Sequence, residues 1–62
     1  MPSPFLVEIK LSFKDMEVVD WLYKNSRVIK IDYQEEEILV FSEIRSSFMP
    51  KLEKKGLNFR KI

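Results

Sequence analysis

The sequence predicts an α+β domain whose strands and helices follow the order β-α-β-β-α-β. Three observations predict it. The first segment alternates apolar and polar side chains, two later segments carry apolar side chains at helical spacing, and an acidic turn divides the middle of the chain into two strand-like stretches. We expect one domain over residues 1–62, with residues 1–4 as a flexible N-terminus.

Residues 5–13 predict the first strand, because an apolar side chain recurs at every second position, whereas the other side carries Leu6, Glu8, Lys10 and Ser12. The polar side includes Glu8 and Lys10, so this face should meet water or a polar partner. The side expected to face the core consists of Phe5, Val7, Ile9, Leu11 and Phe13.

The first helix is expected from residue 14, because the apolar period changes there. Ser12 and Asp15 have the spacing of a capping box, and Asn25-Ser26 should end the helix. Its buried stripe is expected to contain Met16, Val19, Leu22 and Tyr23. Trp21 falls at the flank of this stripe, where it is either a partly buried helix-edge residue or a partner-facing anchor.

Residues 27–44 predict a hairpin. Ile29, Ile31 and Tyr33 alternate with Lys30 and Asp32, and the acidic turn 35–37 then separates this strand from a second one over 38–44. The turn lacks an Asn-Gly or Asp-Gly pair, which leaves its type open. In the second strand, a shift of one residue would exchange Leu39 and Phe41 with Ile38 and Val40 between the two faces.

A second helix follows, with Ser46 or Ser47 as its expected cap and Pro50 in its first turn. Phe48, Met49 and Leu52 should form its buried side. Gly56 is placed where a left-handed residue ends a helix, and residues 57–62 form the final strand. The resulting architecture is a ferredoxin-like sandwich: a four-stranded antiparallel sheet with both helices on one face. Its expected core includes Ile9, Leu11, Val19, Leu22, Ile31 and Phe48.

Composition argues against catalysis. The chain contains no His and no Cys, so it lacks the commonest general base and the strongest nucleophile, and its single glycine rules out a glycine-rich phosphate loop. The run Glu35 to Glu37 is better explained as a solvated turn than as a metal or acid-base site. We therefore expect no enzyme activity, no cofactor, no metal and no nucleotide bound by this chain alone.

Charge and hydropathy favour a soluble, cytoplasmic protein. No signal peptide or membrane-spanning segment is evident, and the absence of Cys suits a reducing compartment. The net charge is +1, so no strong field attracts nucleic acid or anionic lipid. The many charged residues resemble a thermophile's composition.

Contacts with a partner are expected on the open face of the sheet and its rim, because the helices should cover the other face. The candidate partner-binding residues are Glu8, Lys10, Trp21, Lys30, Asp32, Phe41 and Arg60. RNA is a weaker alternative, since the first strand offers no aromatic side chain to the open face and no RNP-like run is present. The basic residues Lys51, Lys54, Lys55, Arg60 and Lys61 are expected to be an ordinary exposed surface.

The segment VEIKLSF, followed by VVDWLYKNSRVIKIDYQEEEILVFSEI and a later KL, resembles the C-terminal domain of HflX-type GTPases. In that family, a helix with an LY pair precedes a strand and an acidic Y-x-E-x-G turn. Glu37 departs from the pattern at the glycine position. The resemblance implies an accessory domain that contacts the ribosome, the GTPase domain or another subunit. A module of the Impact/YigZ family, also linked to translation, is similar.

The sequence therefore predicts a non-catalytic protein-interaction or regulatory module, with a protein partner or the ribosome as its target. A self-associating domain like the ACT or Lrp-type folds, which would form a homo-dimer and could hold a small molecule between subunits, is the alternative. An RNA-binding domain is the second alternative.

Overall fold

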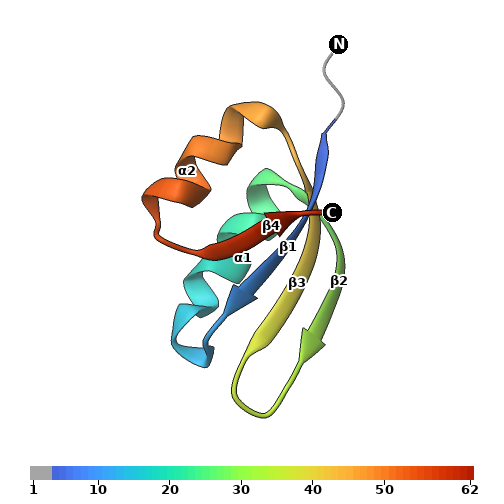
Figure 1. Ribbon diagram of the computed structural model, residues 1–62. Coiled ribbons are helices and arrows are strands. Elements are labelled where there is room, and N and C mark those ends of the chain that lie inside the picture. Colours follow the sequence, from blue (N-terminus) through green and yellow to red (C-terminus); the bar gives the residue numbers. More distant parts are fainter. Residues whose placement is uncertain (1–3) are drawn as a thin grey trace.

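A computed structural model describes residues 4–62 and contains one antiparallel sheet flanked by helices (Figure 1). The sheet order is β2-β3-β1-β4, and both α-helices lie on the same face. This confirms the α+β ferredoxin-like fold. The elements are β1 (Phe5–Leu11), η1 (Phe13–Asp15), α1 (Met16–Asn25), β2 (Arg27–Tyr33), β3 (Ile38–Ile44), η2 (Ser46–Phe48), α2 (Met49–Lys54) and β4 (Asn58–Lys61).

The core lies between the sheet and the two helices. Ile9, Leu11, Val19 and Leu22 are buried as predicted, whereas Ile31 and Phe48 are only partly buried. Ile31 lies on an edge strand, which has a neighbouring strand on one side only. Phe48 lies in η2, at the end of the domain. The remaining buried apolar residues are Val7, Ile38, Val40, Ile44, Met49 and Leu52.

The predicted capping box is confirmed at the entry to α1. The Ser12 hydroxyl accepts a hydrogen bond from the Lys14 amide at 3.3 Å, and the Ser12 amide donates to an Asp15 carboxylate oxygen at 3.3 Å. The cap begins a 3₁₀ turn that leads into the helix. Phe13 belongs to this turn and is exposed, so its placement on the core face of the first strand is wrong; the strand ends at Leu11.

The buried stripe of α1 is rotated from the predicted one. Val19 and Leu22 are buried, but Met16 and Tyr23 are exposed, which corrects the prediction for both. The helix instead turns Trp21 toward η2 and α2, where the indole is partly buried. Packing of α1 against η2 and α2 therefore covers the flank that carries Trp21, and the flank that carries Met16 and Tyr23 stays exposed.

A β-bulge changes the alternation in β2. The irregularity lies between Val28 and Lys30, with Val28 opposite Ser42 and Ile31 opposite Val40 on the helix-covered face. Ile29 does not join Ile31 on that face and is exposed, so the regular alternation predicted for this strand is wrong. Tyr33, opposite Ile38 at the end of the edge strand, is also exposed.

The acidic turn is tight, as predicted, and the Gln34 amide closes it by donating to the Glu37 carbonyl oxygen at 2.9 Å. The two glutamates between them are exposed.

The second helix has no serine cap. Arg45 precedes η2, Phe48 precedes α2, and neither cap position has a side-chain hydrogen bond, so the prediction of Ser46 or Ser47 as the cap is wrong. Pro50 does lie in the first turn of α2. Gly56 has φ +71°, which confirms the predicted left-handed residue after the helix.

Candidate functional site

The sheet face opposite the helices is uncovered, and its side chains form rows across the four strands. In the central row, Lys30 of β2 pairs with Phe41 of β3, Phe41 with Glu8 of β1, and Glu8 with Arg60 of β4. One phenylalanine is thus flanked on its row by charges of both signs. This central row contains most of the residues that the sequence predicted for partner binding.

The row on one side of it contains Asp32, Leu39, Lys10 and Asn58, one from each strand. Leu39 lies next to Phe41 on the same strand face, two positions away. The Asp32 carboxylate accepts a hydrogen bond from the Gln34 side-chain amide at 3.4 Å. The row on the other side contains Arg27, Glu43 and Leu6.

The register of β3 places Phe41 and Leu39 on this open face. Their neighbours Ile38 and Val40 are fully buried, as is Ser42. Phe41 and Leu39 remain partly exposed because long side chains from the adjoining strands lie beside them. The open face therefore has an apolar centre with a charged rim.

Glu8 and Arg60 form the one ion pair in the described part of the chain, with 3.1 Å between Arg60 Nε and Glu8 Oε1. The Glu8 side chain is 14% exposed and the Arg60 side chain 74% exposed. Because the arginine is solvated, the pair contributes little to stability. It does fix the direction in which the Glu8 carboxylate points on the surface.

The structure brings together all the predicted partner-binding residues except Trp21. The indole lies on the opposite side of the sheet, in T-shaped contact with Phe48 at a centroid distance of 5.9 Å. Lys55 Nζ lies 5.4 Å from the centre of the indole ring. Trp21 thus connects α1 to η2 and the end of α2 on the helix-covered side, and it does not share the open face.

Five residues of the open face were not among the predicted candidates: Leu6, Arg27, Leu39, Glu43 and Asn58. The face of Arg27 depends on the bulge after Val28, which no sequence motif marks. Asn58 could have been found from the antiparallel pairing of the first and last strands that the predicted topology requires.

Several lysines of the C-terminal basic group lie over aromatic rings of the fold. Lys51 Nζ is 5.2 Å from the centre of the Phe48 ring, and Lys61 Nζ is 4.2 Å from that of Phe5. Such contacts are typical cation–π pairs. They hold these two ammonium groups against aromatic rings of the domain itself.

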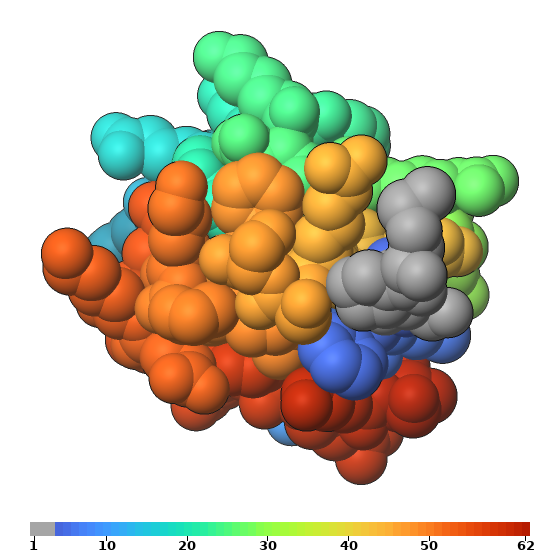
Figure 2. Space-filling view, turned by 90° about the horizontal axis from the view of Figure 1, so that it is seen from above, coloured from blue at the N-terminus to red at the C-terminus, as the bar shows by residue number. Residues whose placement is uncertain are grey.

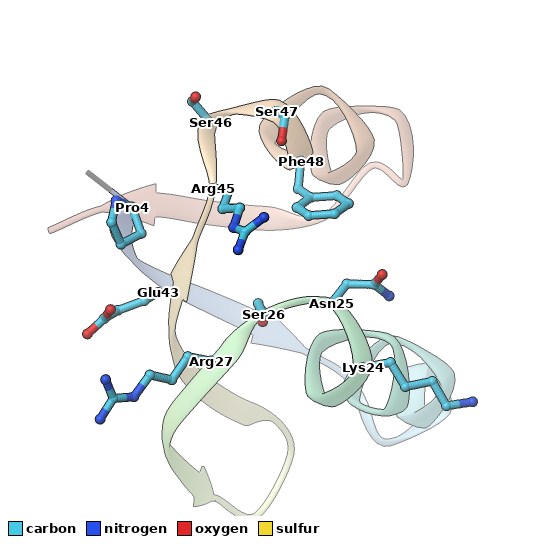
Figure 3. A pocket seen from close by; sticks show the side chains of 10 residues that line it. All are labelled: Pro4, Lys24, Asn25, Ser26, Arg27, Glu43, Arg45, Ser46, Ser47 and Phe48. Atoms are coloured by element: carbon cyan, nitrogen blue, oxygen red, sulfur yellow. The ribbon is translucent and has the colours of Figure 1, made fainter. Parts of the chain in front are cut away.

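A hollow opens at the end of the molecule where α1 ends and η2 begins, at the end seen in Figure 2. Its volume is about 920 Å³. Figure 3 shows the Arg45 guanidinium pointing into this space beside Phe48. Arg27 and Glu43 point away from it on the open-face side, so the rim of the hollow continues into the open face.

Within residues 4–62, no three acidic side chains gather closely enough to hold a metal ion. None of the helices in this part of the chain has the length and apolar character needed to cross a membrane.

Comparisons with protein-family models, curated proteins and solved structures found no match to this chain.

Proposed function

We propose that this chain is a non-catalytic protein-interaction module that binds its partner through the open face of the sheet. The observation that carries the proposal is the position of Phe41 and Leu39 at the centre of that face, with Lys10, Lys30 and Asp32 around them. An apolar centre within a polar rim is the common composition of protein interfaces.

The charged rim favours a protein partner over nucleic acid. Lys30 and Arg60 stand at the two ends of the central row, but Glu8 lies between them and Asp32 beside Lys30. Four cationic and three anionic side chains lie in the rows of this face, so it offers no strong positive field to a phosphate backbone. Moreover, β1 offers no aromatic side chain on which a base could stack, which leaves Phe41 as the only ring in the rows of this face.

The resemblance to the C-terminal domain of HflX-type GTPases suggests which partner to test first. It supports an accessory role in which this face contacts the ribosome, and it requires no nucleotide binding by the chain itself. A cytoplasmic location belongs to the same proposal.

The test is co-sedimentation of the isolated chain with purified ribosomes at physiological salt. The wild-type chain should pellet with ribosomes, and a variant with Lys10→Ser, Phe41→Ser and Arg60→Ser should stay in the supernatant with its cooperative melting kept. Lys51→Ser with Lys54→Ser on α2 is the matched control, because it removes positive charge from the helix side and leaves the open face intact.

If the wild-type chain fails to pellet, the ribosome is not the partner. If the triple variant pellets as well as the wild-type chain, the open face is not the binding surface. A triple variant that has lost its cooperative melting would show that these side chains stabilise the fold, which contradicts their assignment to an uncovered face.

A further inference from the structure

Strand β2 forms one edge of the sheet, and within the described residues no strand lies on its outer side. Its seven residues are paired only with β3, so the backbone groups on its outer side are free to accept another strand. The other edge strand, β4, has four residues, of which Arg60 and Lys61 are charged. A short, charged edge is a poor template for strand addition. The edge open to pairing is therefore β2.

Exposed apolar side chains gather along this same edge. Ile29 and Tyr33 of β2 are 50% and 59% exposed, and Met16 and Tyr23 of α1 are 44% and 60% exposed. An α-helix turns once every 3.6 residues, so Met16 and Tyr23 lie about 140–160° around the helix from Trp21. Trp21 faces η2 and the end of α2, and α1 packs against β2. Met16 and Tyr23 consequently lie on the flank next to the open edge.

The bulge in β2 places residues of opposite charge on one face at the two ends of the strand. Arg27 pairs with Glu43 and Asp32 with Leu39, so both lie on the open face. In a regular strand they would point to opposite faces, because they are an odd number of positions apart. The bulge likewise leaves Val28 and Ile31 together on the helix-covered face.

This arrangement is self-complementary when two copies of β2 run antiparallel. A two-fold axis between Ile29 and Lys30 would place Arg27 opposite the partner's Asp32, and Val28 opposite the partner's Ile31. Each pair would lie on a single face of the sheet, as directly opposed residues in an antiparallel pair must. Both copies carry the extra residue of the bulge, so neither strand has a surplus residue relative to the other. A register centred on Lys30 would instead oppose two ammonium groups, which is unfavourable.

We propose that the chain forms a symmetric dimer by antiparallel pairing of β2 with β2 of a second copy. The two sheets then become one continuous sheet, and the α1 helices lie side by side over the junction. Met16, Tyr23 and Tyr33 lose exposure to water there, which supplies the apolar burial that an edge contact alone lacks. The contact is isologous and uses the same edge of both copies, so assembly closes at two. This dimer does not depend on partner binding by the open face.

The test is the molar mass of the purified chain measured by light scattering and sedimentation equilibrium over a wide concentration range. The wild-type chain should change from the 7.5 kDa monomer to a dimer as concentration rises, and its melting temperature should rise with it. Arg27→Asp and Asp32→Arg should each weaken the dimer by roughly tenfold or more in dissociation constant, because each places like charges opposite one another twice per dimer.

The variant with both Arg27→Asp and Asp32→Arg should restore dimerisation, because the exchanged charges again oppose each other. Lys54→Asp on α2 is the matched control, since it makes the same reversal of charge away from β2 and should leave the mass unchanged. Far-ultraviolet circular dichroism establishes that each variant is folded.

A wild-type chain that stays monomeric at every concentration overturns the proposal and leaves the edge to an extended segment of another protein. Single reversals that dimerise like the wild-type chain also overturn it, as does a double reversal that stays monomeric. The open-face variant with Lys10→Ser, Phe41→Ser and Arg60→Ser should still dimerise. If it dimerises but no longer binds ribosomes, the dimer contact and the partner-binding face are distinct surfaces.

Discussion

The hydroxyl oxygens of Ser26 and Ser42 lie 2.7 Å apart, and they connect the end of α1 to the centre of β3. Ser42 is fully buried. The Ser26 hydroxyl is also 2.7 Å from the Leu22 carbonyl oxygen, and the Ser42 hydroxyl is 3.1 Å from the Arg27 carbonyl oxygen. Two hydroxyl protons cannot satisfy three such contacts at once. The two shortest contacts form a chain in which Ser42 donates to Ser26 and Ser26 donates to the Leu22 carbonyl.

This chain of hydrogen bonds predicts that the losses of unfolding free energy caused by Ser26→Ala and Ser42→Ala are not additive. Ser42→Ala should cost about 1 kcal/mol, the usual net value of a hydrogen bond, because Ser26 keeps its bond to the Leu22 carbonyl. Ser26→Ala should cost a similar amount, since the buried Ser42 hydroxyl can still donate to the Arg27 carbonyl. The double variant should cost less than the sum of the two, as measured by urea denaturation in a double-mutant cycle. Strict additivity would contradict the proposed chain.

Most of the fold follows from the sequence because its strongest signals are local. The alternation of Phe5 to Leu11, the Ser12–Asp15 capping box and the lone Gly56 each specify a backbone conformation through neighbouring residues, and each is observed. The order of elements then restricts the sheet to few arrangements.

The sequence predictions fail where contacts between distant segments determine which side chains are buried. Met16 and Tyr23 fit a helical stripe with Val19 and Leu22, but the second helix covers the Trp21 flank instead. The bulge after Val28 depends on the pairing of β2 with β3 and has no signature in the strand itself. The open face was predicted well in β1, and in β2 for Lys30 and Asp32. Only the position of Arg27 on this face required the structure, because it depends on the bulge.

Truncation of the central core residue of α1 should nearly unfold the protein. Leu22 is fully buried, and Leu22→Ala is expected to cost about 2–5 kcal/mol. Small domains have total stabilities of about 5 kcal/mol, so little would remain. Leu22→Met, which roughly conserves volume, is the matched control and should cost less than about 1.5 kcal/mol. A cooperative thermal transition of Leu22→Ala at the wild-type temperature would refute this role.

The left-handed conformation of Gly56 predicts a purely conformational penalty. A Cβ atom at this position would meet no heavy atom within 4 Å, so steric conflict with the rest of the fold is absent. Gly56→Ala should still cost about 1–2 kcal/mol, because its φ of +71° is unfavourable for a residue with a side chain. Gly56→Asn should be less costly, since asparagine tolerates this conformation. Equal urea midpoints for Gly56→Ala and Gly56→Asn would show that the left-handed backbone conformation does not determine the loss of stability.

The contact between Trp21 and Phe48 predicts a spectroscopic signature, because Trp21 is the only tryptophan in the chain. Phe48→Ala should remove the ring that covers one edge of the indole, so tryptophan emission should shift to longer wavelength as water gains access. Phe13→Ala is the matched control: it removes an exposed ring from η1 and should leave the emission unchanged. The folded variants should be compared at low temperature, with circular dichroism as the measure of folding. If Phe48→Ala stays folded and its emission maximum does not move, other groups shield the indole, and Trp21 does not depend on Phe48 for its partial burial.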